Sequence, residues 1–102
     1  MNAPLDFDST LVRRGVRATT IADMRGFVAG LMDRPLDKLL CDLPGLALLS
    51  ETKFMLAQQV LRRRLQNLPE VEREQLRILA RTVATEASAW AGDRILRLFE
   101  RE

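Results

Sequence analysis

Arginine is the residue type in this sequence that is best suited to binding a charged ligand or partner. The chain has 14 arginines and 2 lysines among its 102 residues, and it has no histidine and no tyrosine. A guanidinium stays protonated at neutral pH, and its planar fork of N–H donors fits a carboxylate or a phosphate. A high-GC genome also enriches arginine through its codons, so the positions of the arginines matter more than their number. The composition favours recognition over catalysis, because the commonest general acid/base is missing.

One group of arginines recurs every four residues in the first half of the last predicted helix, near residues 69–100. Arg73, Arg77 and Arg81 would form a row along one side of that helix, with Glu70 and Glu74 placed to pair with the first two. Arg81 has no acidic residue three or four positions away. We interpret the row either as a charged face exposed to solvent or as a contact for an anionic partner. Arg81 is the member most available to such a partner.

Two further groups contain three arginines each. Consecutive residues on a helix point about 100° apart, so the triplet Arg62, Arg63 and Arg64 cannot form one flat patch. The other group, Arg13, Arg14 and Arg17, lies in an N-terminal stretch without a helical or alternating period. Both groups would be the contacts if the chain binds DNA or RNA.

Other signs of catalysis or metal binding are weak. The single cysteine, Cys41, lies among leucines, which predicts a small core residue more readily than a reactive thiol. No phosphate-binding loop, dinucleotide fingerprint, metal-ligand spacing or nucleophile elbow is present. No apolar run approaches the ~20 residues of a membrane span, and the N-terminus lacks the order of a signal peptide. We therefore expect a cytoplasmic protein with no catalytic centre, no cofactor, no metal and no membrane contact.

The pattern of apolar residues, caps and breakers predicts a compact all-α domain over residues 19–102, preceded by a flexible arm over residues 1–18. Four helices are expected near residues 20–33, 35–43, 50–67 and 69–100. Pro44 and Gly45 would end the second helix, and the leucine-rich residues 46–49 would close one end of the core. Ser50 would cap the third helix, with Leu49 and Phe54 packed together across the cap.

The first and third predicted helices have distinct faces. In the first, an apolar face opposes a row of small residues, which either tolerates the glycines or receives another backbone: Ala22, Gly26, Ala29 and Gly30. The third helix carries apolar residues on several sides, so we expect it to lie at the centre of the fold.

The last predicted helix has two apolar faces. Leu76, Leu79, Val83, Ala87 and Trp90 share one face, whereas Ile95, Leu96, Leu98 and Phe99 lie on another. A continuous helix would be roughly 45 Å long, whereas the third helix covers only ~26 Å of it. Either a kink near Ala91 and Gly92 folds the end back onto the same core, or a partner covers the second face. We favour the partner, and the predicted interface is Ala84, Ser88, Ala91, Gly92, Ile95 and Phe99.

These features favour a small helical protein–protein interaction module that acts as an adaptor, an assembly factor or a regulator. We expect a homodimer that also binds another protein. The alternative is a DNA- or RNA-binding regulator. A salt titration separates the two, because nucleic-acid affinity falls steeply with ionic strength.

Overall fold

The computed structural model describes residues 18–100, apart from the side chains of residues 18 and 19, and every regular element in that range is an α-helix. The helices are α2 (Ala18–Met32), α3 (Leu36–Leu49), α4 (Glu51–Gln66), α5 (Glu70–Glu86) and α6 (Ala89–Arg97). The all-α prediction is therefore confirmed for these residues. The predicted N-terminal arm lies outside the described residues except for Ala18, which begins α2.

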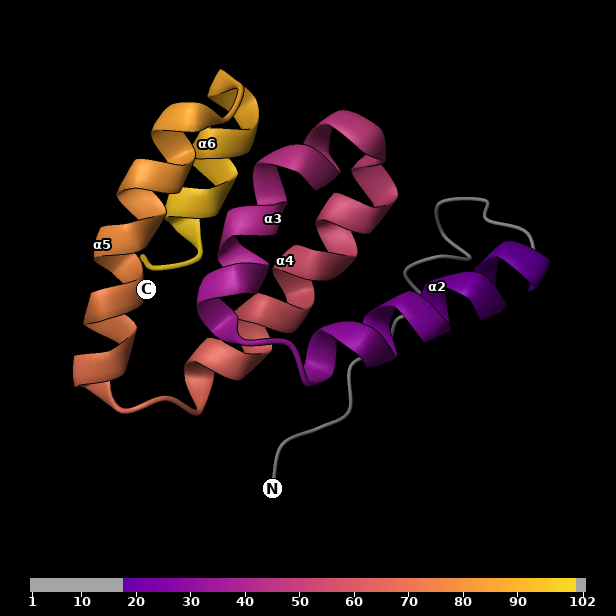
Figure 1. Cartoon of the computed structure of the whole chain (residues 1–102), viewed down its shortest axis with the longest axis horizontal. Coiled ribbons are helices and arrows are strands. Elements are labelled where there is room, and N and C mark those ends of the chain that lie inside the picture. Colours follow the sequence, from indigo (N-terminus) through magenta and orange to yellow (C-terminus); the bar gives the residue numbers. More distant parts are fainter. Residues whose placement is uncertain (1–17, 101–102) are drawn as a thin grey trace.

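The core forms around α3 and α4. Helix α3 contacts α4 on one side and α5 and α6 on the other, while α2 packs on α4 and extends away from the rest of the molecule (Figure 1). Six residues of α4 are buried, on more than one side of the helix: Phe54, Leu56, Ala57, Val60, Leu61 and Leu65. This burial confirms the central position predicted for the helix. The Ser50 hydroxyl accepts a hydrogen bond from the Lys53 amide, as expected for a cap.

Helix α3 continues past Pro44 and Gly45, so the predicted stop at residue 43 is wrong. A proline inside a helix removes one hydrogen bond and costs ~3 kcal/mol. Burial on both sides of the proline offsets that cost, because Leu43 is fully buried and Leu46 packs partly buried against the core. The helix therefore ends only before Ser50.

Three residues of α3 have surroundings that differ from the predicted ones. The buried stripe of α3 follows Leu39, Leu40 and Leu43. Cys41 lies off this stripe and is exposed, so its prediction as a core residue is wrong. Leu48 and Leu49 are 83% and 84% exposed, so they neither close the core nor pack across the Ser50 cap.

The predicted single helix over residues 69–100 is also wrong, because the chain leaves helical geometry at Ala87 and Ser88. Both residues have extended backbone, with ψ of 167° and 158°. Helix α6 then packs beside α5 (Figure 1). The fold-back alternative is the observed one, although the break precedes Ala91 and Gly92. Its physical cause is burial, since Ile95 becomes fully buried in the chain's own core.

Gly92 permits the close packing of α6 on α5. A Cβ atom at this position would lie 2.7 Å from the backbone oxygen of Ala84. Every other residue type carries that atom, so the approach of the two backbones requires glycine here.

Candidate functional site

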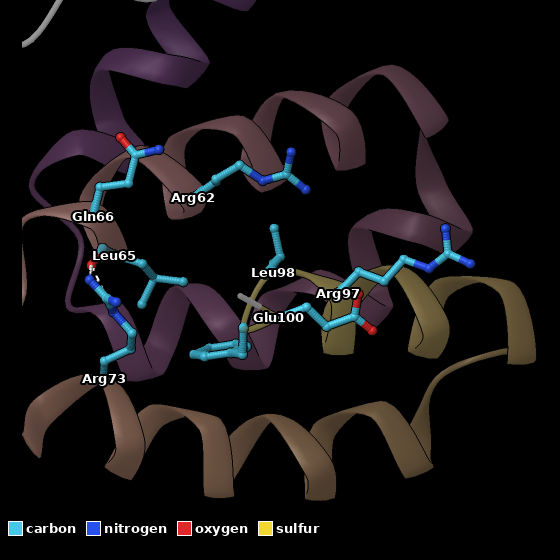
Figure 2. Close-up of a pocket in the computed structure, with 8 residues that line it drawn as sticks. Arg62, Leu65, Gln66, Arg73, Arg97, Leu98 and Glu100 are labelled. Carbon is cyan, nitrogen blue, oxygen red and sulfur yellow. Dashed lines mark hydrogen bonds between the residues drawn. The ribbon is translucent and has the colours of Figure 1, made fainter. Parts of the chain in front are cut away.

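A strongly charged concavity is lined by residues of α4, of α5 and of the end of α6. A cavity of about 510 Å³ has Arg62 and Gln66 of α4 on one side, Arg73 of α5 on another, and Arg97 and Glu100 at the end of α6 (Figure 2). Leu65, Leu98 and Phe99 add apolar surface to it.

A second cavity, of about 410 Å³, shares Arg62 and Arg97 with the first and extends along α4 and α6. It is lined by Gln58, Arg62, Trp90, Asp93, Arg94 and Arg97. The two cavities together are here called the arginine groove. Within it, four guanidinium groups from three helices, those of Arg62, Arg73, Arg94 and Arg97, accompany only two carboxylates, those of Asp93 and Glu100.

The periodicity of the helices places these side chains on the groove. On α4, Gln58, Arg62 and Gln66 follow one another at four-residue intervals and therefore share a side of the helix. On α6, Ala91 and Ile95 are buried in the core, whereas Arg94 and Arg97 are exposed. The amphipathic character of α6 thus fixes which of its residues reach the groove.

The four arginines of the groove differ in their contacts. Arg73 donates from Nε and Nη2 to the backbone oxygen of Leu65, at 3.2 and 2.8 Å, which fixes its guanidinium against α4 (Figure 2). The Arg97 Nε atom lies 3.0 Å from Oδ2 of Asp93, in an exposed ion pair. In the part of the chain that the structure describes, the Arg62 guanidinium makes no hydrogen bond or ion pair. Arg62 is therefore the groove cation most open to a ligand.

Trp90 gives the groove a fixed aromatic surface. Its ring meets fully buried Phe54 edge to face, with centroids 5.3 Å apart, yet 45% of the residue is exposed. The Arg94 guanidinium lies 5.8 Å from the Trp90 ring centroid, at cation–π distance. An exposed indole held by a core residue is a rigid contact surface.

The predicted row of Arg73, Arg77 and Arg81 does not form one free ridge. Arg73 turns to α4, whereas Arg77 pairs with Glu74, with Nε donating to Oε2 at 2.8 Å. The hydrogen bond to Glu74 and the charge of that carboxylate raise the pKa of Arg77. Arg81 is exposed, and its side chain makes no ion pair with another described residue. Only Arg73 of the row reaches the groove.

The arginine triplet is divided, as the helical spacing predicts. Arg64 donates through Nη1 to the backbone oxygens of Leu31, at 3.0 Å, and of Arg34, so it ties α4 to the end of α2. Arg63 is partly buried, and Arg62 lines the groove. The other predicted basic cluster, Arg13, Arg14 and Arg17, lies outside the described residues.

The residues predicted as a protein interface do not form one exposed face. Ala91, Gly92 and Ile95 are buried within the chain, and Ala84 and Phe99 pack partly buried against the same core. Ser88 alone of the set is exposed, at the break between α5 and α6. The apolar surface assigned to a partner is thus largely the inner surface of α6.

Another apolar surface lies on α3 and is here called the leucine face. It comprises Cys41, Gly45, Leu48 and Leu49, which are all exposed and lie opposite the buried stripe of α3. Asp42, beside this face on α3, forms an ion pair with Arg34 at 2.6 Å. Lys38 is exposed on the same side of α3, one turn before Cys41. The sequence reasoning missed this surface because it ended the helix at residue 43.

Among residues 18–100 there is no group of three or more histidine, cysteine or acidic side chains that could hold a metal ion. No helix in that range is long and apolar enough to cross a membrane. Comparison with protein-family models, curated proteins and solved structures finds no match to this chain.

Proposed function

We propose that this chain is a helical protein–protein interaction module, acting as an adaptor, an assembly factor or a regulator, and that it forms a homodimer through the leucine face. The observation that carries the proposal is the exposure of Leu48 and Leu49, at 83% and 84%, beside each other at the end of α3. Contiguous apolar surface of this kind is typical of a protein contact.

A second copy is the partner that suits this face. In a twofold dimer the same surface meets itself, so a charge near the twofold axis would face its own copy. The four residues of the leucine face carry no charge, and Asp42 beside them is paired with Arg34. Lys38, on the same side of α3, lies ten residues before Leu48. Gly45 has no atom within 4 Å of a Cβ built at its position, which leaves room for another helix to approach.

The dimer is expected to dissociate readily. A helix of 14 residues is only about 21 Å long. Its outer face therefore buries less surface than the ~1,200 Å² at the lower end of stable interfaces. We expect a dissociation constant in the range of about 1 μM to 1 mM, so that mass depends on protein concentration.

Sedimentation equilibrium across that concentration range tests the proposal. The wild-type mass should rise toward that of a dimer, whereas the Leu48→Lys, Leu49→Lys double variant should remain monomeric. Lysine is suitable because a cation is tolerated at the C-terminal end of a helix. Val71→Lys is the control, since Val71 is 71% exposed on α5. A wild-type chain that is monomeric at all concentrations contradicts the homodimer.

The DNA- or RNA-binding alternative draws less support from the described residues. Arg64 holds two backbone oxygens near the end of α2, which leaves two members of the triplet for a nucleic acid. Arg62 is in the groove with Asp93 and Glu100, which would repel a phosphate backbone.

A further inference from the structure

We propose that the arginine groove binds an acidic segment of a partner protein, with its carboxylates on Arg62 and Arg97 and an apolar side chain against Trp90. The inference rests on the proposed function, because it takes the chain to be a protein-interaction module. The groove is a second surface, separate from the leucine face, and its side chains determine the chemistry of the partner that it accepts.

The excess of positive charge in the groove favours the binding of an anion. Its four arginines exceed its two carboxylates, and one carboxylate, that of Asp93, is already paired with Arg97. That pair is exposed, and ion pairs of this kind contribute little stability. An incoming carboxylate can therefore share the Arg97 guanidinium without breaking a strong contact, and it meets Arg62 without displacing any described partner.

Arg73 gives the groove a fixed cationic wall. Two of its five N–H donors are used on the backbone oxygen of Leu65, and that contact holds the guanidinium in place. The guanidinium keeps its positive charge, and its three remaining N–H donors point in fixed directions. A guanidinium that is already ordered loses less side-chain entropy on binding than a free one.

Trp90 favours a protein segment over a small anion. Tryptophan and arginine are enriched among the residues that dominate protein–protein binding energy. The indole is already fixed by Phe54 at 5.3 Å, so little entropy is lost when an apolar side chain covers its exposed part. A free phosphate or carboxylate would leave this surface unused.

The two acidic residues favour a peptide over a nucleic acid. Phosphates recur at every nucleotide, so a nucleic-acid strand along the groove would bring charges close to Asp93 and Glu100. A peptide carries carboxylates only at chosen positions and can place neutral or apolar residues beside those two side chains.

The single tryptophan of the chain is a natural reporter for the test, because Trp90 lines the groove. Fluorescence of the full chain is titrated with a synthetic octapeptide of alternating glutamate and leucine. A peptide with lysine in place of glutamate and an oligothymidylate of similar length are titrated in parallel. The acidic peptide should change the emission and saturate, whereas the other two should bind more weakly.

Two matched variants show whether binding uses the groove. Arg62→Gln should weaken the acidic peptide about tenfold, since it removes a charge-assisted contact. Arg81→Gln removes the same charge outside the groove and should leave the affinity unchanged. Equal binding to both variants, no response of Trp90, or tighter binding of the oligothymidylate would overturn the inference. The Leu48→Lys, Leu49→Lys variant should give the wild-type titration, so a failure here is distinguishable from a failure of the homodimer.

Discussion

At the scale of single residues, the glycines of the chain differ in whether the packing of the helices requires them. A Cβ at Gly92 would lie 2.7 Å from the Ala84 oxygen, whereas a Cβ at Gly26 would meet nothing within 4 Å. Both residues lie inside helices. The first glycine is therefore required by packing, and the second only lowers the stability of its helix.

Gly92→Ala should destabilise the domain by about 1–3 kcal/mol, because the new methyl group forces α6 away from α5. Gly26→Ala should stabilise it by up to about 1 kcal/mol through helix propensity. Thermal and urea unfolding followed by circular dichroism measure both changes. Equal effects of the two substitutions would contradict the observed α5–α6 contact.

Ile95 distinguishes the observed fold from the interface predicted from the sequence. Since Ile95 is fully buried, Ile95→Ala should cost about 2–5 kcal/mol of unfolding free energy. Leu96→Ala, at a neighbouring residue that is 40% exposed, should cost less than about 1 kcal/mol. Urea unfolding at low protein concentration is the measurement. A stable, fully helical Ile95→Ala monomer would show instead that the residue faces outward.

At the scale of elements, the break between α5 and α6 decides which residues are inside. Ser88 has φ of −60°, and Ala87 before it is extended. Proline has the same φ and prefers an extended residue before it. A proline at position 88 is therefore compatible with the break but would disrupt a continuous helix.

Ser88→Pro should leave the unfolding free energy unchanged or raise it by up to about 1 kcal/mol. Thr85→Pro, one turn earlier in α5, should lower it by about 3 kcal/mol, because that position is inside a helix. Differential scanning calorimetry compares the two variants. If Ser88→Pro is as damaging as Thr85→Pro, the chain is helical through this point.

The sequence predicted those helix ends that local chemistry determines. The predicted start of α4 is confirmed, since the Ser50 hydroxyl accepts from the Lys53 amide three residues away. The break at Ala87 and Ser88 had no comparable signal, because neither residue is proline or glycine. It depends on the burial of Ile95 in a core formed by distant residues, which periodicity along one helix does not reveal.

Packing on the core also decides the length of α3, which continues through Pro44. A strong local stop signal is overridden because residues on both sides of the proline pack on the core. Once the helix is known to continue, its period places Leu48 and Leu49 outside. The leucine face could thus have been derived from the sequence, had the helix length been known.

At the scale of the whole molecule, the arginine groove shows what a sequence pattern alone does not reveal. Arg62, Arg73 and Arg97 lie on α4, α5 and α6 and come together only because α6 folds back. Along the sequence, Arg62 and Arg73 belong to two different predicted groups, and Arg97 belongs to none. Both groups are divided by the fold, and of their members only Arg62 and Arg73 line the groove.

The proposed homodimer has the leucine face as the contact between its two copies, and concentration-dependent hydrogen–deuterium exchange tests this contact most directly. Amides at residues 46–50 should exchange more slowly at high than at low protein concentration in the wild type. They should show no such difference in the Leu48→Lys, Leu49→Lys variant, because it lacks the apolar contact. Exchange that is independent of concentration throughout the chain, or protection confined to α5 and α6, would contradict a homodimer formed through the leucine face.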